Sequence, residues 1–504
     1  MNNATVKLRN DCMPVVNGKG RRMPGLTLVL PLVLCSCTIG PTFVRPPIDI
    51  PLSYKEQDGW KPAQTQDVNI SQAWWQGYND PILNELLDQV SRSNQSLAEA
   101  EARFRQAQTL VESAQAGRYP TAGIDMATTR SGASERSIQS LTIGTGTTNQ
   151  GRSSTSNALN LRVDWEIDLW GRVRRTVESR EADAQASVAD LVAVRLSAQT
   201  EVAQSYFSLR NIDTQTQLLG RSVRDYERSV KLTQNRYEAG IIAKADLILA
   251  QNQLKSTQAQ ALELEVRRAE LEHAIALLVG KVPSALSIGP GTLTAVVPNV
   301  PATLPSELLE RRPDVAAAER RVAAANANIG IAKAAYFPRL LLSASGGAQS
   351  NALVNLLSLP NRFWSLGPAL ATTLFDGGHR SAEIKLSSAA YDGTVAAYRQ
   401  TVLNGFREVE DNLAALRILE KQARVQAEAV QLSRRSVELT NNQYRAGIVS
   451  YLDVIQIQAT ALGNERAALD IHNRRLAASV LLIKALGGSW MPNAAPVIST
   501  PPAS

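Results

Sequence analysis

The chain has few cysteine, histidine and aromatic residues, and these shortages exclude several classes of protein. Its 504 residues include three cysteines, all within the first 37 residues, so the rest of the chain cannot form a disulfide-stapled fold. The three histidines, His273, His379 and His472, lie far apart without cysteines nearby, which argues against a zinc site and against histidine-based catalysis. No paired acid and base, activated nucleophile or phosphate-binding loop is recognisable. The sequence therefore predicts a protein that is not an enzyme and holds no metal or other cofactor.

Long apolar runs are also missing. Beyond the N-terminal region no segment has about 18 apolar residues in a row, so a helical membrane protein is excluded and any spanning part must be a closed β-barrel. The net charge of +7 is modest, because the first 36 residues carry five basic residues and one acidic residue, which leaves about +3 for the remainder. We therefore expect no nucleic-acid partner.

The N-terminus has the pattern of a secretory signal. Residues 23–34 are almost entirely apolar and follow three basic residues, and the run is too short for a transmembrane helix, which needs about 20 residues. Translation starts at Met1 or Met13, and the sequence leaves this choice open. We predict that residues 1–36 are a signal peptide.

The signal ends in Leu34-Cys35-Ser36-Cys37, which resembles a bacterial lipoprotein box. We predict that Cys37 carries a covalent lipid, and Thr38 in place of an aspartate favours sorting to the outer membrane. An ordinary signal with chance cysteines is the alternative.

The chain repeats itself at an offset of 207 residues. Residues 232–246 recur as 439–453, with Leu, Thr, Asn, Tyr, Ala, Gly, Ile and Asp at matching positions. Further motifs repeat in the same order, which indicates a tandem duplication.

Each half contains the same predicted helices. The proline-free stretches that end at Gly240 and Gly447 are rich in helix-forming residues and are long enough for helices of about 100 Å. We expect shorter helices, of about 35–51 Å, over 93–118, 246–279, 314–336 and 453–486. Their combined lengths suggest that the two shorter helices of each half stack end to end beside the long one.

A predicted β-hairpin separates the short and long helices of each half. Residues 159–169 alternate strictly between apolar and polar side chains, with a weaker partner from Ala122 and a polar loop over 131–157. Arg339–Ser345 and Phe363–Phe375 correspond in the second half. The alternation fits either a soluble amphipathic strand or a membrane strand with lipid on one side, and the signal favours the second. Four strands cannot close a barrel, which needs about eight, so several chains must contribute, and three would give twelve.

The sequence resembles the TolC-like outer membrane factors, in the lipoprotein branch that serves RND-type efflux systems. The motifs that carry the resemblance are Cys37–Pro47, Trp74–Leu83, Asp168–Arg172, Arg311–Val315, Leu374–Gly378 and Phe406–Asp411. The resemblance implies an α+β membrane protein that forms a homotrimer. Four strands per chain would form one twelve-stranded outer membrane barrel, which a long periplasmic helical barrel continues. Its partners would be a periplasmic adaptor, an inner-membrane RND-type transporter and outer membrane lipid.

The resemblance and the repeat together suggest a domain plan. A lipid-anchored segment would span 37–80, the two repeats 81–285 and 313–488, an equatorial linker 286–312 and a flexible tail 489–504.

The two glycine turns are the candidate functional site. A glycine after a long helix suits left-handed backbone, and Asp246 and Asp453 can cap the helices that follow. The resemblance implies further that these turns meet the adaptor and close the tunnel. It assigns the aperture to Tyr444, Asp453, Asp246 and Gln456, and docking to Tyr237, Gly240, Ala446 and Gly447. Because Gln456 stands where many relatives place an aspartate, the sequence does not decide whether the closed aperture has one acidic ring or two.

The leading function is a passive outer membrane duct for an efflux pump. A type I secretion channel and a lipid-anchored periplasmic coiled coil without a pore are the alternatives. The sequence names neither the substrate nor the adaptor and pump, because the pump selects the cargo.

Overall fold

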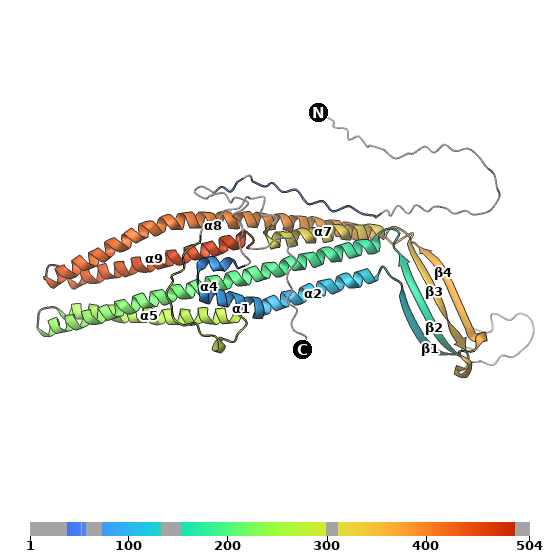
Figure 1. The fold of residues 1–504 in the computed structure, drawn as a ribbon, viewed down its shortest axis with the longest axis horizontal. Helices are drawn as coiled ribbons and strands as arrows, with labels where there is room; N and C mark the ends of the chain where they lie inside the picture. The colour runs from blue at the N-terminus through green and yellow to red at the C-terminus, as the bar shows by residue number, and fades with distance from the viewer. Residues whose placement is uncertain (1–37, 52, 57–72, 133–152, 299–310, 489–504) are drawn as a thin grey trace, which may run out of the picture.

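The protein is described by a computed structural model, which covers residues 38–51, 53–56, 73–132, 153–298 and 311–488. It is elongated, with a four-stranded sheet at one end, long helices along most of its length and two helical hairpin tips at the other end (Figure 1). Among these residues, no helix combines the length and the apolar character needed to cross a membrane. Cys37 and the predicted tail 489–504 lie outside the described residues.

The helices of the two halves have matching lengths, as expected from the predicted duplication. The long helices α4 (Arg172–Glu238) and α8 (His379–Arg445) have 67 residues each. The helices that follow them, α5 (Lys244–Leu278) and α9 (Tyr451–Ala485), have 35 each. The helices that precede the strands, α2 (Gln95–Ala116) and α7 (Pro313–Ala334), have 22 each. The first half also contains a separate helix α1 (Pro81–Ser93), which ends where Asn94 caps α2.

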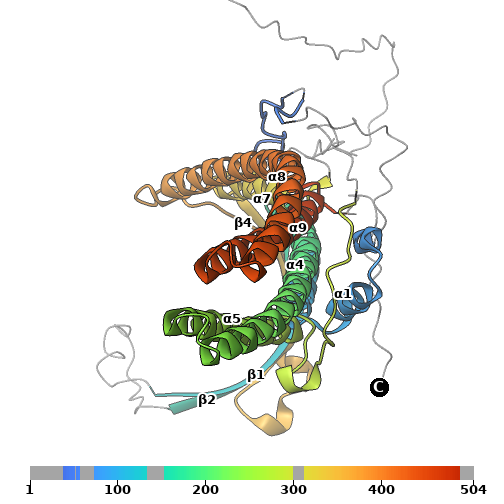
Figure 2. The same cartoon turned by 90° about the vertical axis from the view of Figure 1, so that its left-hand side faces the viewer.

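The helices form one curved layer (Figure 2). Its order follows from the helix contacts, since α8 packs on α7 and α9, α4 packs on the other side of both, and α2 and α5 pack on α4. Helix α8 therefore forms one edge of the layer, and α2 with α5 forms the other.

The predicted end-to-end stacking of the short helices is confirmed at two joints. In the first half, the Nδ2 of Asn94 donates to the carbonyl oxygen of Leu278 at the end of α5, at 2.6 Å. In the second half, the Nη1 of Arg312, the residue before α7, donates to the carbonyl oxygen of Ala485 at the end of α9, at 3.1 Å. The same two places in the repeat are thus joined by different side chains.

Each joint also requires a glycine. Gly280 and Gly487 follow α5 and α9 in left-handed backbone, with φ of 72° and 88°. A Cβ on Gly280 would lie 2.0 Å from the carbonyl oxygen of Ser93, and one on Gly487 would lie 2.0 Å from that of Arg311. No larger residue fits without moving the chain, so glycine sets how closely the stacked helices approach.

A cluster of buried charges holds the segment that follows α5. Arg210 and Asp213 of α4 form an ion pair at 3.0 Å, and Asp213 also bonds to Arg268 of α5 at 2.7 Å. The cluster binds main-chain groups of the extended segment, including the carbonyl oxygen of Gly289, which accepts from Arg210 at 2.6 Å. This arrangement fixes the beginning of the predicted linker against the middle of the helical layer.

The four strands form an open antiparallel sheet in the order β1-β2-β3-β4. They span Thr121–Gly132, Ser153–Ile167, Arg339–Ser350 and Arg362–Ala371. β2 begins six residues before the predicted start at 159, because Ser153–Asn157 pair with the far end of β1. β3 likewise continues five residues past 345, and β4 ends at Ala371 instead of 375. The sequence pattern marked only the apolar part of each strand, whereas cross-strand pairing also recruits polar residues.

The sheet has one apolar and one polar face. The register places Ile124, Leu161, Gly346 and Trp364 in one row on the first face. It places Gly123, Arg162, Ser345 and Ser365 in one row on the second. The alternation predicted for 159–169 is thus confirmed through Ile167, where β2 ends. It is less strict on β3 and β4, since Leu341 and Phe363 lie on the second face and Arg362 on the first.

Candidate functional site at the hairpin tips

The two tips share one backbone geometry. At the end of α4, the amide of Ile241 donates to the carbonyl oxygen of Arg236 and the amide of Gly240 donates to that of Tyr237, both at 2.9 Å. Ile448 and Gly447 make the corresponding bonds at the end of α8. This pair of hydrogen bonds is the Schellman motif, which needs a residue with left-handed backbone conformation at the glycine position. The glycines have φ of 72° and 76°, so the predicted left-handed turns are confirmed.

The helices that leave the two tips begin differently. At the second tip, Ser450 and Asp453 form a capping box, in which the Ser450 hydroxyl accepts from the Asp453 amide and the Asp453 carboxylate accepts from the Ser450 amide. The hydroxyl and amide of Ser450 hold the pKa of the Asp453 carboxyl below its ordinary value. The capping role predicted for Asp453 is therefore confirmed.

Asp246 does not cap its helix. It occupies the first turn of α5, whose N-cap is Ala243, and the cap makes no side-chain hydrogen bond. The alanine side chain has no oxygen that could accept from the Asp246 amide, so the reciprocal side-chain arrangement of the second tip cannot form here. The sequence prediction of a matching cap was wrong for this half.

Tyr444 joins the two hairpins. Its side chain is 8% exposed, its ring lies 5.4 Å from the ring of Tyr451, and the guanidinium of Arg236 lies 4.9 Å over its face. Arg236 belongs to α4, so this cation–π contact crosses from the first hairpin to the second. The hydroxyl of Tyr451 adds a hydrogen bond of 2.9 Å to the hydroxyl of Ser229 on α4.

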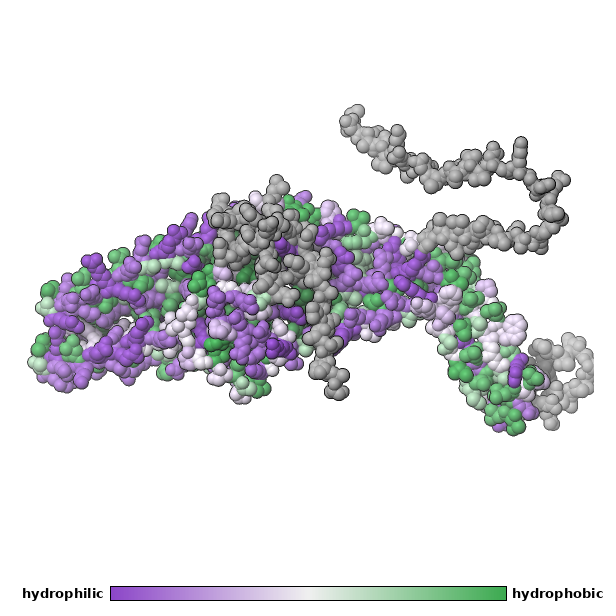
Figure 3. Space-filling view, in the orientation of Figure 1, coloured by the Kyte–Doolittle hydropathy of each residue, from purple (hydrophilic) through white to green (hydrophobic). Residues whose placement is uncertain are grey.

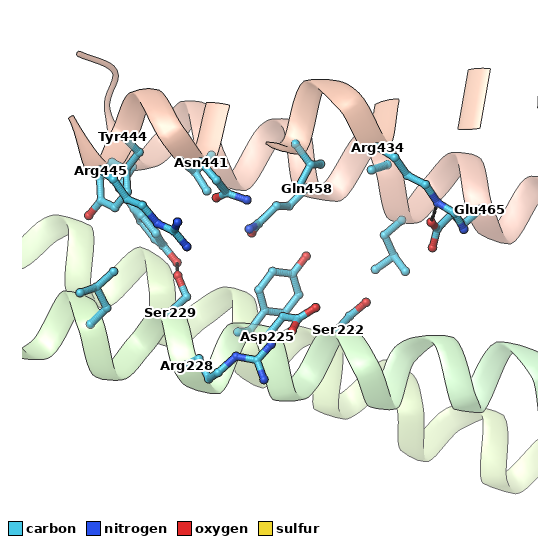
Figure 4. A pocket seen from close by; sticks show the side chains of 17 residues that line it. Ser222, Asp225, Arg228, Ser229, Arg434, Asn441, Tyr444, Arg445, Gln458 and Glu465 are labelled. Carbon is cyan, nitrogen blue, oxygen red and sulfur yellow. Dashed lines mark hydrogen bonds and ion pairs between the residues drawn. The ribbon is translucent and has the colours of Figure 1, made fainter. Parts of the chain in front are cut away.

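A cavity of about 550 Å³ opens beside this contact, between α4 on one side and α8 with α9 on the other. Figure 4 shows Asp225 and Ser229 of α4 on one side of it and Asn441 and Gln458 on the opposite side. Two ion pairs in its walls each lie within one hairpin, Arg434 with Glu465 at 2.5 Å and Arg228 with Asp225. The two hairpins are therefore in contact near their turns, through Arg236 and Tyr444, and the cavity separates them farther along the helices.

Within one chain, the other predicted site residues do not lie close together. Asp453 and Gln456 are exposed on α9, and Asp246 lies half-buried in the first turn of α5. Tyr237, the repeat counterpart of Tyr444, is 37% exposed. Gly240, Ala446 and Gly447 lie exposed on the outside of the turns, and nothing lies within 4 Å of a Cβ added to either glycine.

Sequence reasoning missed the partners of Tyr444. Arg236, Tyr451 and Ser229 were not predicted as site residues. A signal was present, because the repeat position that matches Arg236 holds Gln443, so the two tips differ where the contact forms. Only the fold shows that α4 and α8 approach each other there.

A duplicated helical hairpin continued by a sheet with one apolar face defines the class of elongated outer membrane channels. The chain belongs to the outer membrane efflux protein family, whose profile matches residues 86–281 and 304–488. It is 31% identical to the outer membrane protein OprJ of Pseudomonas aeruginosa over 92% of this chain and 95% of the relative. It is 30% identical to the pyoverdine export outer membrane protein OpmQ of the same species, over 91% of this chain and 95% of that relative.

Solved structures agree. The outer-membrane channel OprN matches with a TM-score of 0.82 and 28% identity, over 90% of this chain and 99% of that one. The MtrE outer membrane channel of Neisseria gonorrhoeae matches with a TM-score of 0.78 and 25% identity, over 90% and 98%. The predicted family and localisation are confirmed: the protein lies in the outer membrane and serves efflux.

Proposed function

We propose that three copies of the chain form one passive exit duct through the outer membrane and periplasm. The observation that carries this proposal is the open sheet, since β1 and β4 have no partner on their outer sides within the described residues. Unpaired edges of long strands are unstable in lipid and prone to pair with another chain. Pairing β4 of one copy with β1 of the next closes twelve strands around a common axis.

The helical layer has edges that suit the same assembly. Helix α8 exposes an apolar seam with a period of seven residues, formed by Ile418, Val425, Leu432 and Leu439. The opposite edge, formed by α2 and α5, exposes Leu110, Leu262 and Val266. Different edges that pack head to tail form a closed ring when the rotation is right. The heptad spacing is typical of helices that pack side by side.

The two faces of the sheet then have distinct roles. The apolar face, with Ile124, Leu161 and Trp364, would contact lipid, and the polar face, with Arg162 and Ser345, would line the water-filled lumen. Figure 3 shows hydrophobic side chains gathered along the sheet, while the outside of the helical region is more polar.

The lipid on Cys37 remains part of the proposal. Its support is the position of the next described residues, since the amide of Ile39 donates to the carbonyl oxygen of Trp170 at 3.2 Å, just before α4 begins. Arg175 also donates to the carbonyl oxygens of Ile39 and Gly40. A chain tied at the junction of sheet and helices would hold an attached lipid near the membrane surface.

The hairpin tips would bind a periplasmic adaptor, and an inner-membrane transporter would supply energy and choose the cargo. Relatives of similar identity are named for different substrates, pyoverdine for OpmQ and toluene for TtgF of Pseudomonas putida, 27% identical over 92% of this chain and 96% of the relative. A duct that serves unlike cargoes cannot be the main selector. The efflux relatives favour this function over a type I secretion channel, and the apolar sheet face argues against a coiled coil without a pore.

Mass measurement in detergent tests the assembly. We expect a particle of three mature chains, and Val425→Asp, which places a charge in the α8 seam, should lower the trimer fraction. The matched control Arg424→Asp changes the neighbouring residue, outside the seam, and should leave the trimer intact. A monomeric parent protein would contradict the shared sheet.

A further inference from the structure

An extended N-terminal segment lies along the α8 edge of the helical layer. This strap, residues 38–51 and 53–56, runs beside α8 at the edge opposite α5 (Figures 1 and 2). Arg45 of the strap forms an ion pair of 2.5 Å with Glu319 of α7. Two apolar side chains of the strap pack on the buried cluster that α7 and α8 share, Phe43 and Ile48. The strap is therefore a fixed part of the fold.

The end of the strap is bound to α8. The amides of Lys55 and Glu56 donate to the two carboxylate oxygens of Glu410, at 2.7 and 2.9 Å. The carboxylate of Glu56 forms an ion pair with Arg417, one residue before the α8 seam begins at Ile418. Both carboxylates at this contact have partners, so other protein can cover the strap end without burying an unpaired acid.

This contact lies between two exposed apolar rows on α8. Residues seven apart on a helix lie on the same side, because seven residues make nearly two full turns. In the half of α8 nearer the sheet, four residues with this spacing are apolar and exposed: Ala382, Ala389, Ala396 and Leu403. The next two positions of the same spacing are Glu410 and Arg417, and the α8 seam follows from Ile418. The strap end therefore lies within the surface through which α8 would meet a neighbouring copy.

The joint of the first half, where α5 ends beside the start of α2, offers a matching surface at the other edge of the layer. Leu277, near the end of α5, is 75% exposed, and Val282, just after α5, is 64% exposed. The strap end lies level with the joint of the second half, since Glu408, two residues before Glu410, pairs with Arg312 at 2.7 Å. Figure 1 shows the two joints at the same level along the molecule, because α5 and α9 end at matching places. In a ring of identical copies, the first-half joint of one copy would therefore face the strap end of its neighbour.

We propose that the strap end, residues 53–56, is held between two copies of the chain, with the first-half joint of the neighbouring copy packed against it. This inference rests on the proposed trimer. It extends the contact between copies from the α8 seam toward the sheet, and it removes Leu277 and Val282 from water, which is favourable. Because the strap begins next to Cys37, the segment that would carry the lipid is fixed by two copies at once.

Photo-cross-linking tests the inference on the full-length protein in its membrane. The photoreactive amino acid benzoylphenylalanine replaces one exposed residue at a time: Lys55 in the strap end, Val425 in the α8 seam or Val296 in the linker. Position 425 reports on the proposed trimer by itself. Val296 is the control, since it is 72% exposed and follows Ala295, whose carbonyl oxygen contacts His472 of α9, away from both edges. A denaturing gel separates single chains from cross-linked pairs, and mass spectrometry identifies the joined peptides.

We expect cross-linked pairs from positions 55 and 425 and none from 296, with position 55 joined to the region 277–282 of the other copy. Pairs from 425 without pairs from 55 would overturn the inference, while the trimer stands. Pairs in which position 55 is joined to a different part of the other copy would overturn it as well. No pairs from either position would contradict the α8 edge as a contact between copies, and so the proposed assembly itself. If the substitution at 55 prevents assembly, position 53, which is also exposed, carries the same measurement.

Discussion

The two hairpin tips have the same backbone and different chemistry. Both end a 67-residue helix in a Schellman turn at a glycine, and both lead into a 35-residue helix. Yet Tyr444 is buried against the other hairpin while Tyr237 is exposed. The α9 helix has a capping box and α5 has none.

The comparison shows which features the two copies of a repeated segment retain. Turn geometry depends on a residue that tolerates positive φ, so the glycines of both tips and both joints persist. Side chains on the helix surfaces contact different neighbours in the two halves, so the residues at equivalent positions differ. Arg236 contacts Tyr444 across the hairpins. Gln443, at the equivalent position of the second half, is uncharged and cannot form a cation–π contact with Tyr237. The contact between hairpins is therefore made once per chain.

The largest loss of stability is expected when a joint glycine is replaced, because neighbouring atoms enclose it. The tip glycines have open space around them, so their replacement should cost less. Gly487→Ala would force a Cβ to 2.0 Å from the carbonyl oxygen of Arg311, in left-handed backbone. We expect a loss of roughly 2–5 kcal/mol from backbone strain and overpacking. Thermal unfolding followed by circular dichroism measures it, and Gly280→Ala should behave alike. A stability equal to that of Gly447→Ala would contradict the enclosed joint.

At the tips, a bulky residue should cost function more than folding. Gly447→Val meets no neighbouring atom, so the expected loss is the strain of positive φ, about 1–3 kcal/mol. We expect the trimer to reach the membrane and drug efflux to be abolished, because the side chain occupies the docking surface. Drug susceptibility of a strain that depends on this channel measures the loss. Gly393→Ala, which is also in open space but within α8, is the control, and normal efflux by Gly447→Val would refute the docking role.

Arg236→Gln gives the first tip the residue of the second and removes the contact between the hairpins. The cation–π contact is worth about 0.5–1 kcal/mol, so folding should persist. If the contact holds the duct closed, single-channel conductance in bilayers and sensitivity to large antibiotics should both rise. Tyr237→Ala changes an exposed ring and should leave the single-channel conductance unchanged. Unchanged conductance in Arg236→Gln would show that the contact is structural and does not gate.

The smallest overall effect, a small loss of stability without a change in conductance, is expected for substitutions at the helix N-caps. Ser450→Ala should cost about 1 kcal/mol and leave conductance unchanged, because it removes the hydroxyl that accepts from the first turn of α9. Ala243→Ser tests the converse, since it could supply the cap that α5 lacks. Thermal unfolding compares the two variants with the parent. Increased conductance in Ser450→Ala would assign the capping box to the gate.

The same cap predicts a pH dependence. Because the pKa of Asp453 is lowered in the folded protein, its contribution is fully present above the pKa of the unfolded chain. The contribution is lost as the pH falls through the folded pKa. Stability measured from neutral pH into the acid range should therefore fall more in the parent than in Asp453→Asn. Parallel curves would contradict this contribution.

Much of the fold could be predicted because it depends on local patterns. The spacing of glycine and proline set the lengths of the long helices to within a few residues, and strict alternation found the core of β2. The joints were expected only as geometry, because Asn94 and Arg312 carry no common signal. The outer ends of the strands were missed because polar residues there pair through the backbone, which leaves no periodic pattern.

The sequence by itself determined the duplication, the helices, the left-handed turns and the family, since each is encoded within short stretches of chain. The tertiary structure alone decided which tyrosine is buried between the hairpins. That outcome depends on residues that are distant in sequence, such as Arg236 and Tyr444. The difference between the caps, in contrast, was already present in the sequence as Ser450 against Ala243. Nearly identical motifs therefore acquired different roles, because packing between the hairpins gave each motif a different environment.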